Sequence, residues 1–118
     1  MKLRLEHIAI HCPKYQEALE FYGKFFAGEI GPERRGAQGY SFRFMKMDGE
    51  ECLQLMDTAG EIGVHHIGFA TDDIQEALRE FSARGAKILR EVKTPEGVLR
   101  GFFVEDPSGL QIEIRIPH

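Results

Sequence analysis

The sequence predicts an α+β fold made of two β-α-β-β-β modules in tandem. The strand-like stretch LEHIAIH, residues 5–11, is echoed by VHHIGFA at 64–70, so that two histidines stand 59 positions apart. Shifting the chain against itself by 59 positions aligns eight identical residues without a gap, including the run QEAL at 16–19 and 75–78. A repeat at a fixed period indicates one structural unit written twice. We therefore expect one domain, residues 1–118, built from module 1–59 and module 60–118.

Each module reads in the same order. An alternating strand, about 3–11 or 64–71, is followed by a helix with a single apolar stripe. The first helix shows this stripe at Tyr15, Leu19, Tyr22 and Phe26, and the second at Ile74, Leu78 and Phe81. Asp73 and its neighbours can cap the start of the second helix, and Gly85 can end it. Three more strands complete each module, near 28–34, 39–47 and 50–57, then near 86–92, 98–105 and 109–116.

Composition narrows the class of protein. A chain of 118 residues that is 42% hydrophobic can bury one modest core. A net charge of −4 gives no global basic field of the kind that duplex nucleic acid usually requires, although local arginine clusters are still compatible with it. No apolar run is long enough to cross a membrane. Cys12 and Cys52 lack the spacing of a zinc knuckle or a redox pair. We expect a cytoplasmic protein with reduced thiols.

Polar residues inside apolar strands predict a metal site. In the last strand, alternation leaves Glu113 on the face opposite the isoleucines, and the position 59 residues earlier is Gln54, between two leucines. His7 and His66 likewise face away from the side that would lie beneath the helices. Two imidazoles, a carboxylate and an amide oxygen suit a divalent transition metal with coordination positions left open. Parity turns His65 the other way, so we interpret it as structural.

Each of these residues, taken alone, could also have a purely structural role. One histidine in a strand is more often a hydrogen-bonded structural residue, and Glu113 and Gln54 could be half-exposed sheet positions. Their common offset favours the site.

Hairpin register extends this prediction to the pocket. Asp48-Gly49 is typical of a two-residue hairpin turn, which places Arg43 opposite Gln54. The turn at 106–109 does the same for Phe102 and Glu113. We therefore expect the following residues to line the substrate site: Arg43, Met45, Met56, Arg100, Phe102 and Arg115. Arg100 opposite Arg115 favours an anionic substrate between like charges, although arginines exposed to solvent or paired across a dimer would read the same.

The stretches HIAI, HHIGFATDDIQEAL and FFVEDPSGLQIEI resemble the vicinal oxygen chelate superfamily, which includes glyoxalase I, methylmalonyl-CoA epimerase, extradiol dioxygenases and bleomycin-binding proteins. The resemblance covers essentially the whole chain. It implies the glyoxalase-like fold, a curved mixed sheet around a concave metal cleft, with ligands at His7, Gln54, His66 and Glu113. It also implies a homodimer, and leaves open whether one chain or two complete the site.

The ligand set indicates which activities to expect. Our first expectation is a metal-dependent lyase or isomerase of the glyoxalase I type, with Glu113 taking the substrate proton. The alternative is racemisation of the methylmalonyl-CoA epimerase type, whose ligand set is similar to this one. A further alternative is a non-catalytic drug-binding protein. The metal could be Zn, Ni, Co, Mn or Fe, and the substrate an anionic thiol conjugate or a CoA thioester.

Overall fold

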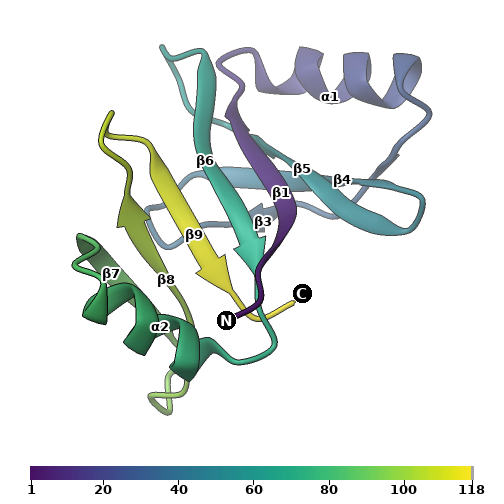
Figure 1. Ribbon diagram of the computed structural model, residues 1–118. Helices are drawn as coiled ribbons and strands as arrows, with labels where there is room; N and C mark the ends of the chain where they lie inside the picture. The colour runs from purple at the N-terminus through teal and green to yellow at the C-terminus, as the bar shows by residue number, and fades with distance from the viewer. Residues whose placement is uncertain (118) are drawn as a thin grey trace. The chain divides into compact units, whose positions relative to one another are not determined.

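The computed structural model describes residues 1–117 and divides the chain into two compact units (Figure 1). One, here the His7 unit, comprises His7–His65. The other, the His66 unit, comprises Met1–Glu6 together with the chain from His66 onward. The first six residues thus belong with the second half of the chain, which the expected division at residue 59 does not show. Strands β1 (Arg4–His11) and β6 (Gly63–Ala70) each run from one unit into the other, and they change unit at the two histidines of the repeat.

The His7 unit contains one helix and a mixed sheet. Its elements after β1 are α1 (Tyr15–Phe25), β2 (Glu29–Ile30), β3 (Arg34–Arg35), β4 (Ser41–Met47) and β5 (Glu50–Met56). The sheet order is β2-β4-β5-β1, with β3 also paired to β4, and β1 is parallel to β5. Leu19 of α1 packs against Leu55 and Cys12 in a small core. Burial raises the pKa of the Cys12 thiol, which keeps it protonated as a core residue.

The prediction of one strand in this unit, near residues 28–34, is wrong. Residues 28–34 do not form a single strand but two short pieces, β2 and β3, separated at Gly31-Pro32. Gly31 donates its N–H to the carbonyl of Phe44 at 2.8 Å, but the next residue, Pro32, has no N–H to continue the ladder.

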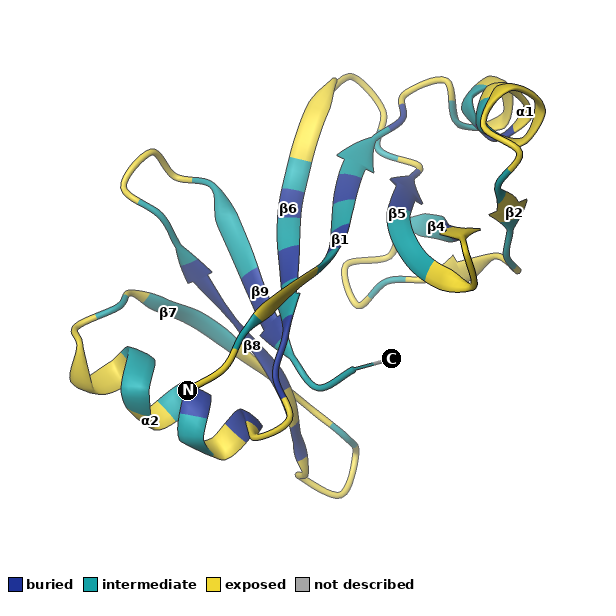
Figure 2. Ribbon diagram, turned by 45° about the vertical axis from the view of Figure 1, so that its right-hand side comes forward, coloured by how far each residue is buried: buried dark blue, intermediate teal, exposed yellow. Residues whose placement is uncertain are grey.

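The His66 unit repeats the arrangement. It contains β6, α2 (Ile74–Ala83), β7 (Ile88–Lys93), β8 (Leu99–Glu105) and β9 (Gln111–Arg115), in the sheet order β6-β9-β8-β7. Strands β6 and β9 are parallel, whereas β8 is antiparallel to both neighbours. Helix α2 covers one face of this sheet, and β8 is almost wholly buried in Figure 2. The predicted β-α-β-β-β order is confirmed in this half of the chain, and the other half follows it except that the strand expected at 28–34 is divided into β2 and β3. No helix within residues 1–117 is long and apolar enough to cross a membrane.

The helix ends differ between the units. Asp73 caps α2 as predicted, because its side chain accepts a hydrogen bond from the Glu76 N–H at 3.0 Å, and Gly85 follows the helix with a φ of +83°. At the corresponding place after α1 stands Ala27, with a φ of +52°. This left-handed conformation is unfavourable for any residue with a Cβ.

Replacing Ala27 with glycine is expected to stabilise the protein. Relief of the left-handed strain, about 1–2 kcal/mol, exceeds the cost of extra freedom in the unfolded chain, about 0.4–1 kcal/mol. The free energy of unfolding from urea titration should therefore rise. Ala86→Gly is the matched control, because the repeat aligns Ala86 with Ala27 but no positive φ is found there, and it should destabilise. A lower unfolding midpoint for Ala27→Gly would contradict the strain.

Both hairpins depart from the expected register by one residue. In the first, Asp48 and Gly49 have φ values of +52° and +80° and Met47 faces Glu50, as predicted. The pairing then shifts between Lys46 and Met45, so that Phe44 and not Arg43 lies opposite Gln54. Such a bulge places two residues of one strand against one of its partner.

The second hairpin reaches the same register by a different route. The Asp106 N–H donates to the carbonyl of Leu110 at 2.9 Å, which leaves three connecting residues, and Gly109 has a φ of +93°. The Asp106 carboxylate also accepts hydrogen bonds from the N–H groups of Ser108 and Leu110. Phe103 and not Phe102 therefore lies opposite Glu113.

Candidate metal centre

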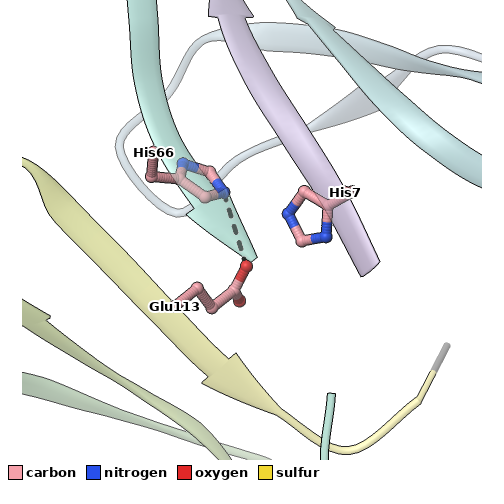
Figure 3. Close-up of side chains that lie close together, drawn as sticks. All are labelled: His7, His66 and Glu113. Atoms are coloured by element: carbon pink, nitrogen blue, oxygen red, sulfur yellow. Dashed lines mark ion pairs between the residues drawn. The ribbon is translucent and has the colours of Figure 1, made fainter. Parts of the chain in front are cut away.

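His66 and Glu113 form a buried pair in the His66 unit. Strands β6 and β9 bring Gly68 opposite Glu113, and His66 lies two residues before Gly68, so both side chains share one face of the sheet. The imidazole Nε2 lies 3.4 Å from the Glu113 Oε1, and the side chains are only 4% and 10% exposed. Figure 3 shows the two groups directed toward each other, together with the side chain of His7.

The guanidinium of Arg115 holds the other carboxylate oxygen of Glu113. Arg115, two residues along β9, places its Nη1 3.6 Å from the Glu113 Oε2. Its Nε also lies 3.8 Å from the Glu6 Oε1. The two oxygens of Glu113 therefore have different neighbours, and Arg115 orients the carboxylate so that Oε1 faces the imidazole. This contact accounts for Arg115 more directly than the substrate contact expected from the sequence.

The His7 unit contains the equivalent pair of positions. Ala9 of β1 lies opposite Gln54 of β5, and His7 is two residues before Ala9, just as His66 is two residues before Gly68. His7 is 1% exposed and Gln54 is 7% exposed. Local strand geometry thus follows the 59-residue repeat at both positions.

Each of these histidines contacts a phenylalanine edge-on. The Phe103 ring centroid lies 5.4 Å from that of His66, and the Phe44 centroid lies 5.6 Å from that of His7. The two phenylalanines also lie opposite Glu113 and Gln54 in the hairpins. They form apolar walls that fix the imidazole planes. Sequence reasoning missed this role, although the identity of Phe44 and Phe103 at the repeat offset was a usable signal.

The residues present fit a divalent metal. Imidazole nitrogen and carboxylate oxygen bind Zn²⁺ and similar divalent ions at about 2.0–2.2 Å. Two neighbouring ligand atoms are then roughly 3.0 Å apart in octahedral coordination and roughly 3.5 Å apart in tetrahedral coordination. The 3.4 Å between the His66 Nε2 and the Glu113 Oε1 lies in that range. Arg115 supplies the outer contact that a ligating carboxylate usually has.

The register shift moves four expected substrate residues away from this face. Arg43 lies opposite Leu55 and Met45 opposite Leu53, on the side that packs against α1. Phe102 is fully buried, and its ring centroid lies 5.5 Å from that of Phe81 in α2.

Arg100 is displaced in the same way, because Gly101 and not Arg100 lies opposite Arg115. The predicted facing pair of arginines is therefore wrong. Met56 keeps the face predicted for it, since it is two residues from Gln54, and it is fully buried. A substrate contact for Met56 stays a prediction.

The chain belongs to the glyoxalase/bleomycin resistance protein/dioxygenase superfamily, whose family model matches residues 4–114. The predicted family and fold are therefore confirmed. Among curated proteins, the mitochondrial methylmalonyl-CoA epimerase of Dictyostelium discoideum is 24% identical over 100 residues. That match covers 73% of this chain but only 60% of the relative's length.

Solved structures share the fold across nearly the whole chain. A methylmalonyl-CoA epimerase in complex with methylmalonyl-CoA and NH4+ has a TM-score of 0.81 and 22% identity, covering 99% of this chain and 96% of its own. A variant of the Streptomyces coelicolor methylmalonyl-CoA epimerase, in complex with 2-nitronate-propionyl-CoA, has a TM-score of 0.79 and 22% identity, covering 97% and 94%.

Proposed function

We propose that the protein is a metal-dependent epimerase that moves the proton on the α carbon of an acyl-CoA thioester. The observation that carries this proposal is the buried, oriented Glu113 carboxylate beside His66. The similarity to methylmalonyl-CoA epimerases supports the CoA thioester as substrate class. It favours the epimerase alternative over the glyoxalase I reaction that we expected first from the sequence.

Four residues hold the metal in this proposal. His7, His66 and Glu113 are the candidate ligands that carry imidazole or carboxylate groups, and Gln54 supplies an amide oxygen from the position equivalent to Glu113. A divalent metal bound there would supply a Lewis acid that acidifies the C–H beside a chelated carbonyl. Phe44 and Phe103 keep water from the imidazoles, which strengthens electrostatic effects on the substrate.

Glu113 moves the proton. Its carboxylate takes the proton from the α carbon, which becomes planar, and a proton from solvent that adds to the opposite face inverts the configuration. The proton taken by Glu113 is released to solvent, which restores the carboxylate. Arg115 keeps the carboxylate in position throughout. The homodimer inferred from the family resemblance stays a prediction.

Metal removal and reloading test the function. We expect the purified protein to contain a divalent metal and to lose activity on dialysis against a chelator, and we expect one or more of Zn, Ni, Co, Mn and Fe to restore it. Activity is measured as exchange of the α proton of methylmalonyl-CoA with solvent deuterium, followed by NMR. The hemithioacetal of methylglyoxal and glutathione is assayed in parallel. Turnover of the hemithioacetal alone would establish glyoxalase I chemistry instead, and a metal-free protein inactive on both would favour a binding module.

A further inference from the structure

Arg90 stands in one row with the candidate metal ligand Glu113. Arg90 of β7 lies opposite Phe103 of β8, which in turn lies opposite Glu113 of β9. Residues directly opposite each other in neighbouring strands place their side chains on the same face. Adjacent strands are about 4.8 Å apart, so the Cα atoms of Arg90 and Glu113 are separated by about 10 Å across this face.

The Arg90 guanidinium leans toward the candidate metal pair. Its central carbon lies 3.8 Å from the centroid of the Phe103 ring, and that ring makes a T-shaped contact with His66. Its Nη1 donates a hydrogen bond at 3.0 Å to the Oε1 of Gln111. Gln111 is the residue opposite His66 in the parallel pair of strands. Both contacts of the guanidinium are therefore neighbours of His66.

Neither contact offsets the positive charge. Within residues 1–117, no carboxylate lies within ion-pair distance of Arg90. The equivalent half of the chain provides a contrast. Arg34 lies over Phe44 at 5.4 Å, but its Nη2 also pairs with the Glu51 Oε2 at 3.1 Å. The charge of Arg34 is therefore already paired with a carboxylate of the chain, whereas the charge of Arg90 is available to an anion from outside the chain.

We propose that Arg90 binds the carboxylate of the substrate's acyl group, which restricts the epimerase to CoA thioesters that carry a carboxylate beside the reacting carbon. This inference rests on the proposed function. The guanidinium binds a carboxylate through two parallel N–H donors, and its ring support holds those donors in place. An acyl carboxylate is bonded directly to the α carbon, so it is the part of the substrate's charge that stays on the same face of the sheet as Glu113 and Arg90. The CoA phosphates, in contrast, are separated from the thioester by the whole pantetheine arm.

Arg90→Met is the informative variant, because methionine keeps an apolar contact with Phe103 and removes the charge. Arg34→Met is its matched control in the other half of the chain. Isothermal titration measures the affinity of metal-loaded wild type and both variants for methylmalonyl-CoA and for propionyl-CoA, which lacks the carboxylate. Arg90→Met should lose roughly 10- to 100-fold in affinity for methylmalonyl-CoA and keep its affinity for propionyl-CoA. Arg34→Met should match wild type for both thioesters.

The outcomes separate this inference from the proposed activity. An equal loss for both thioesters would assign Arg90 to the CoA moiety and overturn the proposal, and so would no loss for either. A wild-type protein that prefers methylmalonyl-CoA through Arg90 but does not exchange its α proton would support the carboxylate contact while removing the epimerase. A wild-type protein that exchanges the proton but binds both thioesters equally would support the epimerase and overturn the carboxylate contact of Arg90. Thermal unfolding of both variants checks that they are folded.

Discussion

Replacing His66 with alanine is expected to abolish stable binding of a divalent metal. The imidazole is buried, and its Nε2 lies 3.4 Å from the Glu113 Oε1. Its loss removes a nitrogen ligand, and a water molecule in its place would bind the metal less strongly. Changes to residues that merely orient a ligand cost about 10- to 100-fold in metal affinity, so loss of the ligand itself should cost more than about 100-fold. Inductively coupled plasma analysis after dialysis and titration with Zn²⁺ measures the effect.

His65→Ala is the matched control for this variant. His65 is the adjacent residue, but it belongs to the His7 unit, where its ring packs near those of His11 and Tyr40. It should retain metal at the wild-type level. If both variants bound metal equally well, or if His65→Ala alone lost it, the assignment of His66 as the ligand would be wrong. Circular dichroism confirms that each variant is folded before the comparison is made.

Replacing Glu113 with glutamine is expected to stop proton exchange while leaving the fold intact. Glutamine already occupies the equivalent position 54 in the other half of the chain, opposite Phe44 just as Glu113 is opposite Phe103. The amide can still offer an oxygen to the metal but cannot accept the α proton. Loss of a general base costs about 100- to 10,000-fold, and the rate of deuterium incorporation into methylmalonyl-CoA should fall by that factor.

Glu105→Gln tests whether the removal of another negative charge from this sheet would also slow proton exchange. Glu105 lies opposite Gln111 and pairs with Lys87 at 3.1 Å, so its neutralisation should leave the exchange rate near that of wild type. A Glu113→Gln protein that retains metal and exchanges protons at the normal rate would remove Glu113 as the base. Metal content is measured on the same samples, so that loss of metal is not mistaken for loss of the base.

The repeat in the sequence predicted the candidate ligands by a local argument. Alternation along a strand decides which residues share a face, and it needs no knowledge of the partner strand. For this reason His66 could be distinguished from His65, and Gln54 could be inferred from Glu113. The structure places His66 and Glu113 together, and it places His7 and Gln54 in the same relative positions within their own unit.

The residues around these ligands could not be predicted in the same way. Arg43 and Phe102 were assigned from hairpin register, and each assignment was wrong by one residue. In the first hairpin the turn formed as expected, but a bulge followed it; in the second, the Asp106 side chain and a left-handed Gly109 formed a longer connection. The bulge and the longer turn both depend on hydrogen bonds between residues of different strands. The alternation of polar and apolar residues along one strand carries no information about these bonds.

By itself the sequence determined the doubled module, the superfamily and the faces on which His7, Gln54, His66 and Glu113 lie. Only the tertiary structure decided which residues lie opposite Gln54, Glu113 and Arg115: they are Phe44, Phe103 and Gly101, rather than Arg43, Phe102 and Arg100. It also placed Arg90 opposite Phe103. The physical reason is that the direction of a side chain is a property of its own strand, whereas its neighbour across the sheet is set by the pairing of two strands. A single extra residue in that pairing replaces every neighbour along the row.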